Sequence, residues 1–494
     1  MRRLPALLLA VGLALLGRPS ILRAEAVTAI PGTEVTSAQH LSLEQCIDLA
    51  LGVEGNAALR AERERRRELD GQMGQARATG LPTLDLSGTW SRGRDPSFAF
   101  NSTFGGDGVD AGGTGNATLD SLLAGFSFIP APEDIAAQTF WRSSLNARWE
   151  LRPGLVFNAV GAAGLGIERQ DAAVRGAEHR AVETVMTSYH ALVAQAENLA
   201  ALDADLAAKR EFLSVTRKRQ ALGLSTPLDT LRAAVALANL EPERRNAAQN
   251  LRDAGARLNL AMGREPLTPL TVTGEQAVEL DPLPARVPAA AVAARSDLRQ
   301  IELLQSILRK NRGAQKAQHR PYLSADASYG YVTSEFDQLF DTGHDFWSAS
   351  VTLTVPLFDG LSTRGKVTET EASIRRTGIE YRDALRQAEL ELESTLGALA
   401  AARETLLAAS LNEQAAAEAL AQTQQRYGLG KADYLSVLDA QTQHRLARQN
   451  GIAARSQVLG LTATVKRLLG HDPREALGAV LDALPAADAA ASGR

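Results

Sequence analysis

The stretch that decides the fold runs from Phe346 to Gly430 and begins FWSASVTLTVPLFDGLSTRGKV (346–367). From Trp347 to Val355 apolar and polar residues alternate, which is the period of a strand with one apolar and one polar face. Pro356 closes this strand because proline cannot donate a hydrogen bond to a sheet. The start of the stretch therefore predicts a two-faced strand of the kind that crosses a membrane.

The rest of the stretch predicts one very long helix. From Leu361 to about Tyr427 no proline occurs, and Ala, Leu, Glu, Gln and Arg dominate, all of which favour helix. At a rise of ~1.5 Å per residue, such a helix would be on the order of 100 Å long. A conduit or a coiled coil uses a helix of this length, whereas a globular enzyme rarely does.

Composition excludes several classes of function. With 45 % hydrophobic and 22 % charged residues the chain has the balance of a folded protein. Its net charge of -4 gives no basic surface for nucleic acid. Neither a P-loop nor a G-x-S-x-G, C-x-x-C or H-E-x-x-H motif is present, so we expect no enzyme, no cofactor and no metal site.

The first 26 residues have the pattern of an export signal. Met1-Arg2-Arg3 is basic, residues 4–16 are apolar, and Ala24-Glu25-Ala26 matches a cleavage site. We expect a cleaved signal peptide, with an uncleaved anchor as the alternative. No other apolar stretch is long enough for a membrane helix, so any spanning of a membrane would fall to strands.

The mature chain reads as a tandem duplication. Proline and glycine positions recur in register between its halves, which shared composition alone would not produce. The first helix is expected from Leu43 to about Ala78. The predicted order is a signal peptide (1–26), a first repeat (41–265) with a hairpin (82–152) and long helices (155–263), a linker (266–287), a second repeat (288–470) with a hairpin (321–358) and long helices (361–470), and an Ala-rich tail (471–494).

Four segments share the two-faced strand pattern, at 84–91, 145–151, 323–331 and 347–355. Trp and Tyr favour the rims of a bilayer, and such candidate rim aromatics lie within or beside the four segments. These are Trp90, Trp141, Trp149, Tyr329, Tyr331 and Trp347. Two ordinary surface hairpins are the alternative. Because four strands cannot close a hollow barrel, membrane strands would have to be pooled from several chains.

Several short stretches together resemble the TolC-like outer-membrane efflux proteins, over residues 41–469. They are Leu43-Glu44-Gln45, Leu81-Pro82-Thr83-Leu84, Val355-Pro356-Leu357-Phe358-Asp359-Gly360, Arg426-Tyr427 and Val437-Leu438-Asp439-Ala440. The resemblance implies an all-α periplasmic tunnel plus a membrane β-barrel, made by a homotrimer whose four strands per chain form a twelve-stranded barrel. It also implies an outer-membrane location, a periplasmic adaptor and an inner-membrane pump as partners.

The same resemblance points to a gate at the tips of the two long helical hairpins. It implies tip turns at Gly223 and Gly430, and gate positions at Tyr427, Asp439 and Asp229. Three symmetry-related carboxylates around one axis would attract cations. The alternative for the two aspartates is an ordinary exposed or capping carboxylate.

Two positions depart from the family pattern. Ala432 stands where the resemblance expects an arginine, with Lys431 beside it, and Ser436 stands where it expects a second acid. The closing contacts are therefore expected to be looser, with the selectivity ring resting on Asp439.

The sequence thus predicts a passive outer-membrane exit duct of a tripartite efflux or type I secretion system. A trimeric surface adhesin with a coiled-coil stalk is the alternative. A generically polar interior does not specify whether the cargo is a drug, a metal ion or a protein, and the glycine-rich 105–115 loop remains without an assigned role.

Overall fold

The structure is a computed structural model that describes residues 39–93, 137–223, 225–273, 278, 282–283, 289–341 and 343–482. The predicted signal peptide (1–26) and the glycine-rich loop (105–115) lie outside these residues. The chain divides into two units, Met1–Gln39 and His40–Arg494. The elements below belong to the second unit, apart from Gln39.

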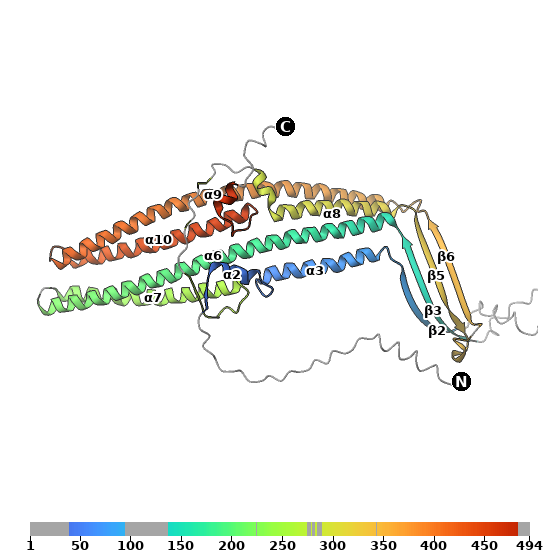
Figure 1. Cartoon of the computed structure of the whole chain (residues 1–494), viewed down its shortest axis with the longest axis horizontal. Coiled ribbons are helices and arrows are strands. Elements are labelled where there is room, and N and C mark those ends of the chain that lie inside the picture. The colour runs from blue at the N-terminus through green and yellow to red at the C-terminus, as the bar shows by residue number, and fades with distance from the viewer. Residues whose placement is uncertain are drawn as a thin grey trace, which may run out of the picture. The chain divides into compact units, whose positions relative to one another are not determined.

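Four strands form one antiparallel sheet in the order β2-β3-β5-β6 (Figure 1). They are β2 (Thr83–Gly93), β3 (Gln138–Leu151), β5 (Tyr322–Thr333) and β6 (Asp345–Thr354). Each overlaps a segment whose alternation predicts a strand, although β3 begins at Gln138, before the predicted start at Leu145. The central pair joins the two halves of the chain, since Leu145 of β3 lies opposite Tyr329 of β5. The two predicted hairpins therefore merge into a single sheet and do not stand as separate surface hairpins.

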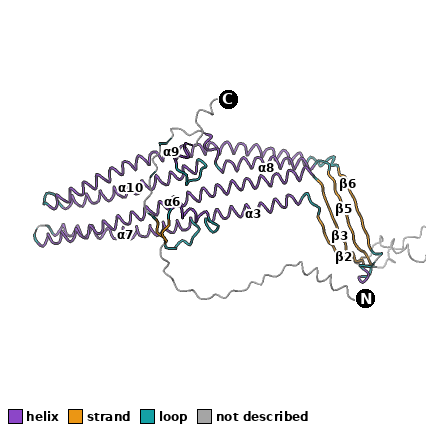
Figure 2. The backbone as a smooth tube through the Cα atoms, viewed as in Figure 1, coloured by secondary structure: helices purple, strands orange, loops and turns teal. Residues whose placement is uncertain are grey.

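Each strand is joined directly to a helix of one packed layer, shown beside the sheet in Figure 2. These helices are α3 (Ala57–Ala78), α6 (Pro153–Ala221), α8 (Ser296–Gln318) and α9 (Ser362–Gly428). Helix α6 packs against α3 and α8, and α8 packs against α9. With 69 residues, α6 is about 100 Å long. The long helix predicted after Leu361 is α9.

Two more helices fold back on the long ones. Helix α7 (Pro227–Ala261) returns along α6, and α10 (Tyr434–Leu468) returns along α9 and also packs against α6. The chain therefore presents two long helical hairpins. Within the described residues, no helix combines the length and the apolar character that a membrane crossing needs.

Short elements surround the middle of the long helices. They are β1 (Gln39–Leu41), α2 (Leu43–Leu51), β4 (Leu270–Val272), η1 (Ala289–Ala294) and α11 (Leu477–Asp482). Strand β1 pairs with β4. One apolar core joins α2 to α6 and α7, and a second joins η1 to α9, α10 and α11. Leu477 and Val480 are fully buried in the second core, so the predicted Ala-rich tail begins with a packed helix.

The expectation of one helix from Leu43 to Ala78 is wrong. The helix stops at Leu51, and a new one starts at Ala57. Gly52 ends the first of these helices, and Asn56 starts α3, because its side-chain oxygen accepts the Ala58 N–H at 3.0 Å. Its side-chain nitrogen donates to the Ala261 carbonyl at the end of α7, also at 3.0 Å. Asn56 thereby starts α3 and fixes this start to the end of α7.

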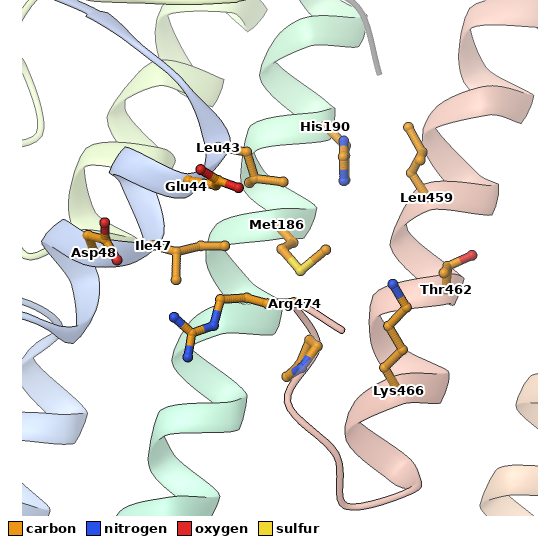
Figure 3. Close-up of a pocket in the computed structure, with 11 residues that line it drawn as sticks. Leu43, Glu44, Ile47, Asp48, Met186, His190, Leu459, Thr462, Lys466 and Arg474 are labelled. Carbon is orange, nitrogen blue, oxygen red and sulfur yellow. The ribbon is translucent and has the colours of Figure 1, made fainter. Parts of the chain in front are cut away.

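A cavity of about 420 Å³ lies between α2, α6 and α10. Figure 3 shows His190 of α6 and Lys466 of α10 reaching into the space between these helices, with Glu44 of α2 on the far side. His190 is 4 % exposed and Lys466 is 3 % exposed. Burial, and then the charge of Lys466, lowers the pKa of His190 from 6.5 to about 4. His190 is therefore neutral at neutral pH.

Gly263, just after α7, has a positive φ of 79°, and a Cβ there would overlap the carbonyl oxygen of Gly55. Gly223 has a similar φ of 73°, with open space around the same position. We therefore expect Gly223→Ala to destabilise by about 1 kcal/mol through backbone strain alone. Gly263→Ala should lower the thermal midpoint more than Gly223→Ala does, because its new methyl group would also overlap the Gly55 carbonyl. Equal losses in thermal melts would contradict the close approach at Gly55.

His190→Gln should reduce the loss of stability in acid. Because the folded pKa lies below the unfolded one, the unfolded state binds the proton first as pH falls. Stability should therefore fall between pH ~6.5 and ~4, by about 3 kcal/mol at most. Between pH 7.5 and pH 4 to 5, the thermal midpoint of the wild type should fall further than that of the variant. Parallel pH profiles would show that His190 is not held neutral by folding.

Candidate site at the helix tips

The tips of the two hairpins are in contact. Leu213 of α6, Ala233 of α7 and Tyr434 of α10 form one buried cluster, and Tyr427 of α9 packs against it. Both turns use the same device, because Gly223 and Gly430 adopt left-handed φ angles of 73° and 72°. The predicted tip turns therefore lie at corresponding places in the two hairpins, at the left of Figure 1.

Tyr427 is held by side chains of the other hairpin. Its ring centroid lies 5.3 Å from that of Phe212, and the Arg219 guanidinium carbon lies 4.9 Å from the centre of its ring. Phe212 also stacks with Tyr434 at 5.4 Å. Burial raises the pKa of Tyr434, so it remains a neutral phenol. The sequence gives no signal for Phe212 or Arg219, because their role depends on how the hairpins pack together.

The two predicted gate aspartates lie in different settings. Asp229 closes a capping box with Thr226, whose backbone N–H donates to its carboxylate at 3.0 Å. The Thr226 hydroxyl also donates to this carboxylate, and these hydrogen bonds lower its pKa. Asp229 therefore acts as a capping carboxylate. Asp439 is exposed on α10, and the described residues provide it with no hydrogen bond.

A third aspartate at the tips is Asp433, which the sequence analysis missed. It caps α10 by accepting the Ser436 N–H at 3.0 Å, and the hydrogen bonds from Ser436 lower its pKa. Ser436 thus serves the cap at a position where the resemblance expects an acid. The signal was available, since an aspartate three residues before a serine at a helix start is a common N-terminal pattern.

Polar bridges join α6 to α10 from the middle of the helices toward the tips. Their order follows the antiparallel register of the two helices. The bridges are Arg467–Glu183 at 2.6 Å, Arg455–Glu197 at 3.2 Å, Gln449–Asn198 at 3.2 Å, Arg445–Asp205 at 3.7 Å and Lys209–Gln441 at 3.2 Å. Burial raises the pKa of Asp205 and lowers that of Lys209, so this part of the interface is partly shielded from water. We call these five contacts the α6–α10 ladder.

The candidate rim aromatics all lie on one face of the sheet. Trp90 lies opposite Trp141, and Tyr329 lies opposite Trp347. Tyr331 stands beside Tyr329, with ring centroids 5.8 Å apart. These five residues gather in the half of the sheet away from the helices. The sixth, Trp149, lies at the helix end of β3, where its indole N–H donates to the Gly80 carbonyl at 3.0 Å.

The two faces of the sheet differ sharply. On the aromatic face, Leu86, Trp347 and Val351 are each 74 to 77 % exposed in the single chain. On the opposite face, side chains hydrogen-bond across the strands, as from Ser328 to Asn146 at 2.8 Å. Arg148 and Asp326 add an ion pair at 2.9 Å on the same face. The sheet is therefore apolar on one side and hydrogen-bonded on the other.

Comparison with known proteins agrees with this architecture. The family model for outer membrane efflux proteins matches residues 49–264 and 287–471. The solvent efflux pump outer membrane protein SrpC of Pseudomonas putida is 28 % identical over 272 residues, covering 54 % of this chain and 57 % of SrpC. OprJ of Pseudomonas aeruginosa is 27 % identical over 278 residues, with 54 % and 57 % covered. The chain thus aligns with little more than half the length of these relatives.

Solved structures share the fold over a longer range. A membrane protein from Pseudomonas aeruginosa superimposes with a TM-score of 0.71 at 23 % identity, covering 87 % of this chain and 93 % of that one. VceC, an outer membrane protein of Vibrio cholerae, gives a TM-score of 0.68 at 20 % identity, with 87 % and 96 % covered. The family match spans most of the chain. The chain therefore belongs to the outer membrane efflux protein family, and it is an outer-membrane protein with a periplasmic extension.

Proposed function

We propose that this chain forms a passive exit duct for a tripartite efflux or type I secretion system. The observation that carries the proposal is the two-faced sheet that continues directly into long helices. An apolar face suits outer-membrane lipid, and a hydrogen-bonded polar face suits a wet interior. The energy for transport would come from an inner-membrane pump, coupled through a periplasmic adaptor.

The edges of the sheet support a homotrimer. Among the described residues, β2 and β6 each pair on one side only. In lipid, unpaired backbone groups on these edges would cost several kcal/mol each, so they need partners. Three copies that join β6 of one to β2 of the next supply twelve strands, enough for a closed and hollow barrel. The duplicated order of elements gives each copy two equivalent hairpins for this ring.

The helix tips are the proposed gate. Tyr427 holds the α9–α10 hairpin against α6, and the α6–α10 ladder extends this attachment along both helices. To widen the tip, the α9–α10 hairpin would have to leave α6, which breaks the contacts nearest the tip first. Asp439, exposed beside these contacts, supplies the proposed ring of three carboxylates. Asp229 is less suited to that role, because its carboxylate is engaged by Thr226.

The alternative of a trimeric adhesin has less support. An adhesin with a barrel anchor would gather its strands at one end of the sequence. Here each pair of strands is followed by its own long helical hairpin, and the family match covers both halves.

The duct and its ion preference can be tested together. Purified protein should migrate as a trimer after cross-linking and should conduct ions in planar bilayers, with a reversal potential that indicates cation preference in a salt gradient. Asp439→Asn should move the reversal potential toward zero, because three charges leave the axis. Asp229→Asn is the matched control, which should weaken the α7 cap and lower the thermal midpoint while keeping the reversal potential.

A monomer without conductance would rule out the duct. A conducting trimer whose reversal potential is unchanged by Asp439→Asn would retain the duct and remove Asp439 from its selectivity ring.

A further inference from the structure

The ring of Tyr427, close to the end of α9, contacts two side chains of α6 near the tips. Phe212 and Arg219 are seven residues apart, so two turns of α6 bring them to the same side of the helix. Phe212 meets the ring at a centroid distance of 5.3 Å and an interplanar angle of 40°. Arg219 lies over the ring at 4.9 Å. Two side chains of one hairpin therefore hold one ring of the other.

The Arg219 guanidinium has few other attachments. Its Nε atom is buried and lacks a hydrogen-bond partner, and no carboxylate among the described residues forms an ion pair with it. A partly buried cation without a counter-charge is unfavourable unless something replaces the lost water. The negative face of an aromatic ring does so, and the flat guanidinium suits such a contact better than an ammonium.

The hydroxyl group of Tyr427 is not part of this contact. Within the described residues it makes no hydrogen bond, while the ring is half-buried between hairpins. The residue thus acts through its face. A latch formed by a hydrogen bond would instead need the hydroxyl group of the tyrosine.

We propose that Arg219 is a positioning residue for the closed tip, and that it holds Tyr427 through the ring face. Ala432 stands where the resemblance expects an arginine. Arg219 supplies an arginine from a different helix, and it acts through a cation–π contact. This inference rests on the proposed duct function and concerns how the duct is kept shut.

The test measures open probability of the full-length protein in planar bilayers at one voltage, pH and salt concentration. Arg219→Gln should raise the ratio of open to closed states by roughly 2- to 30-fold for each of the three tips, the range of one cation–π contact. Arg219→Lys should recover part of the closed state, since an ammonium keeps a weaker attraction. Arg217→Gln, an exposed residue on the same turn, is the matched loss of charge and should leave the ratio at the wild-type value.

Substitutions at Tyr427 separate the ring from the hydroxyl. Tyr427→Phe should behave as wild type, whereas Tyr427→Leu should open at least as far as Arg219→Gln, because it also loses the ring contact with Phe212. The double variant Arg219→Gln/Tyr427→Leu should open no further than Tyr427→Leu alone, because the leucine variant has already lost the ring that Arg219 contacts. Thermal midpoints and trimer bands report whether each variant folds. If Arg219→Gln fails to assemble, the comparison of Tyr427→Phe with Tyr427→Leu still tests the ring-face contact.

The outcomes distinguish this inference from the function beneath it. A conducting wild type in which Arg219→Gln matches Arg217→Gln overturns the role of Arg219. Opening by Tyr427→Phe to the level of Tyr427→Leu overturns the ring-face contact and favours the hydroxyl. A wild-type protein that conducts no ions overturns the duct itself, and this inference with it.

Discussion

The structure depends on how α6 is buried. A helix of 69 residues has no core of its own, so each of its turns needs a neighbour to cover its apolar side chains. Near the sheet those neighbours are α3 and α8, farther along they are α2 and α10, and α7 covers the rest. The buried side of α6 therefore moves around the helix along its length. Helix α9 is then placed by α8 and α10, which themselves pack against α6.

This arrangement explains which features the sequence predicts well. Strand alternation depends on nearest neighbours along the chain, so Trp347 to Val355 predicts β6 closely. The absence of proline after Leu361 predicts α9 for the same reason. The predicted first helix is too long, because Asn56 starts a second helix at this point and is held there by Ala261, which is distant in sequence.

The tip site was only partly predictable, and the reason is again physical. Motif resemblance placed Tyr427 and the two tip glycines. It did not indicate that Arg219 would lie over Tyr427, since the contact joins two hairpins whose relative placement no local pattern encodes. Asp229 matched a gate position, yet its local role with Thr226 is readable from helix capping alone. Resemblance and capping rules pointed to different roles for one carboxylate.

The nearly equal lengths of the two hairpins impose a constraint of another kind. Helices α7 and α10 both have 35 residues, and α6 and α9 have 69 and 67. Removing one residue from α9 would withdraw its end by ~1.5 Å and turn every later side chain by about 100°. Tyr427 would then face away from α6. Substitution in α9 leaves the facing of Tyr427 intact, whereas a change of length has to restore it, as the loss or gain of seven residues does by turning the helix through nearly two full turns.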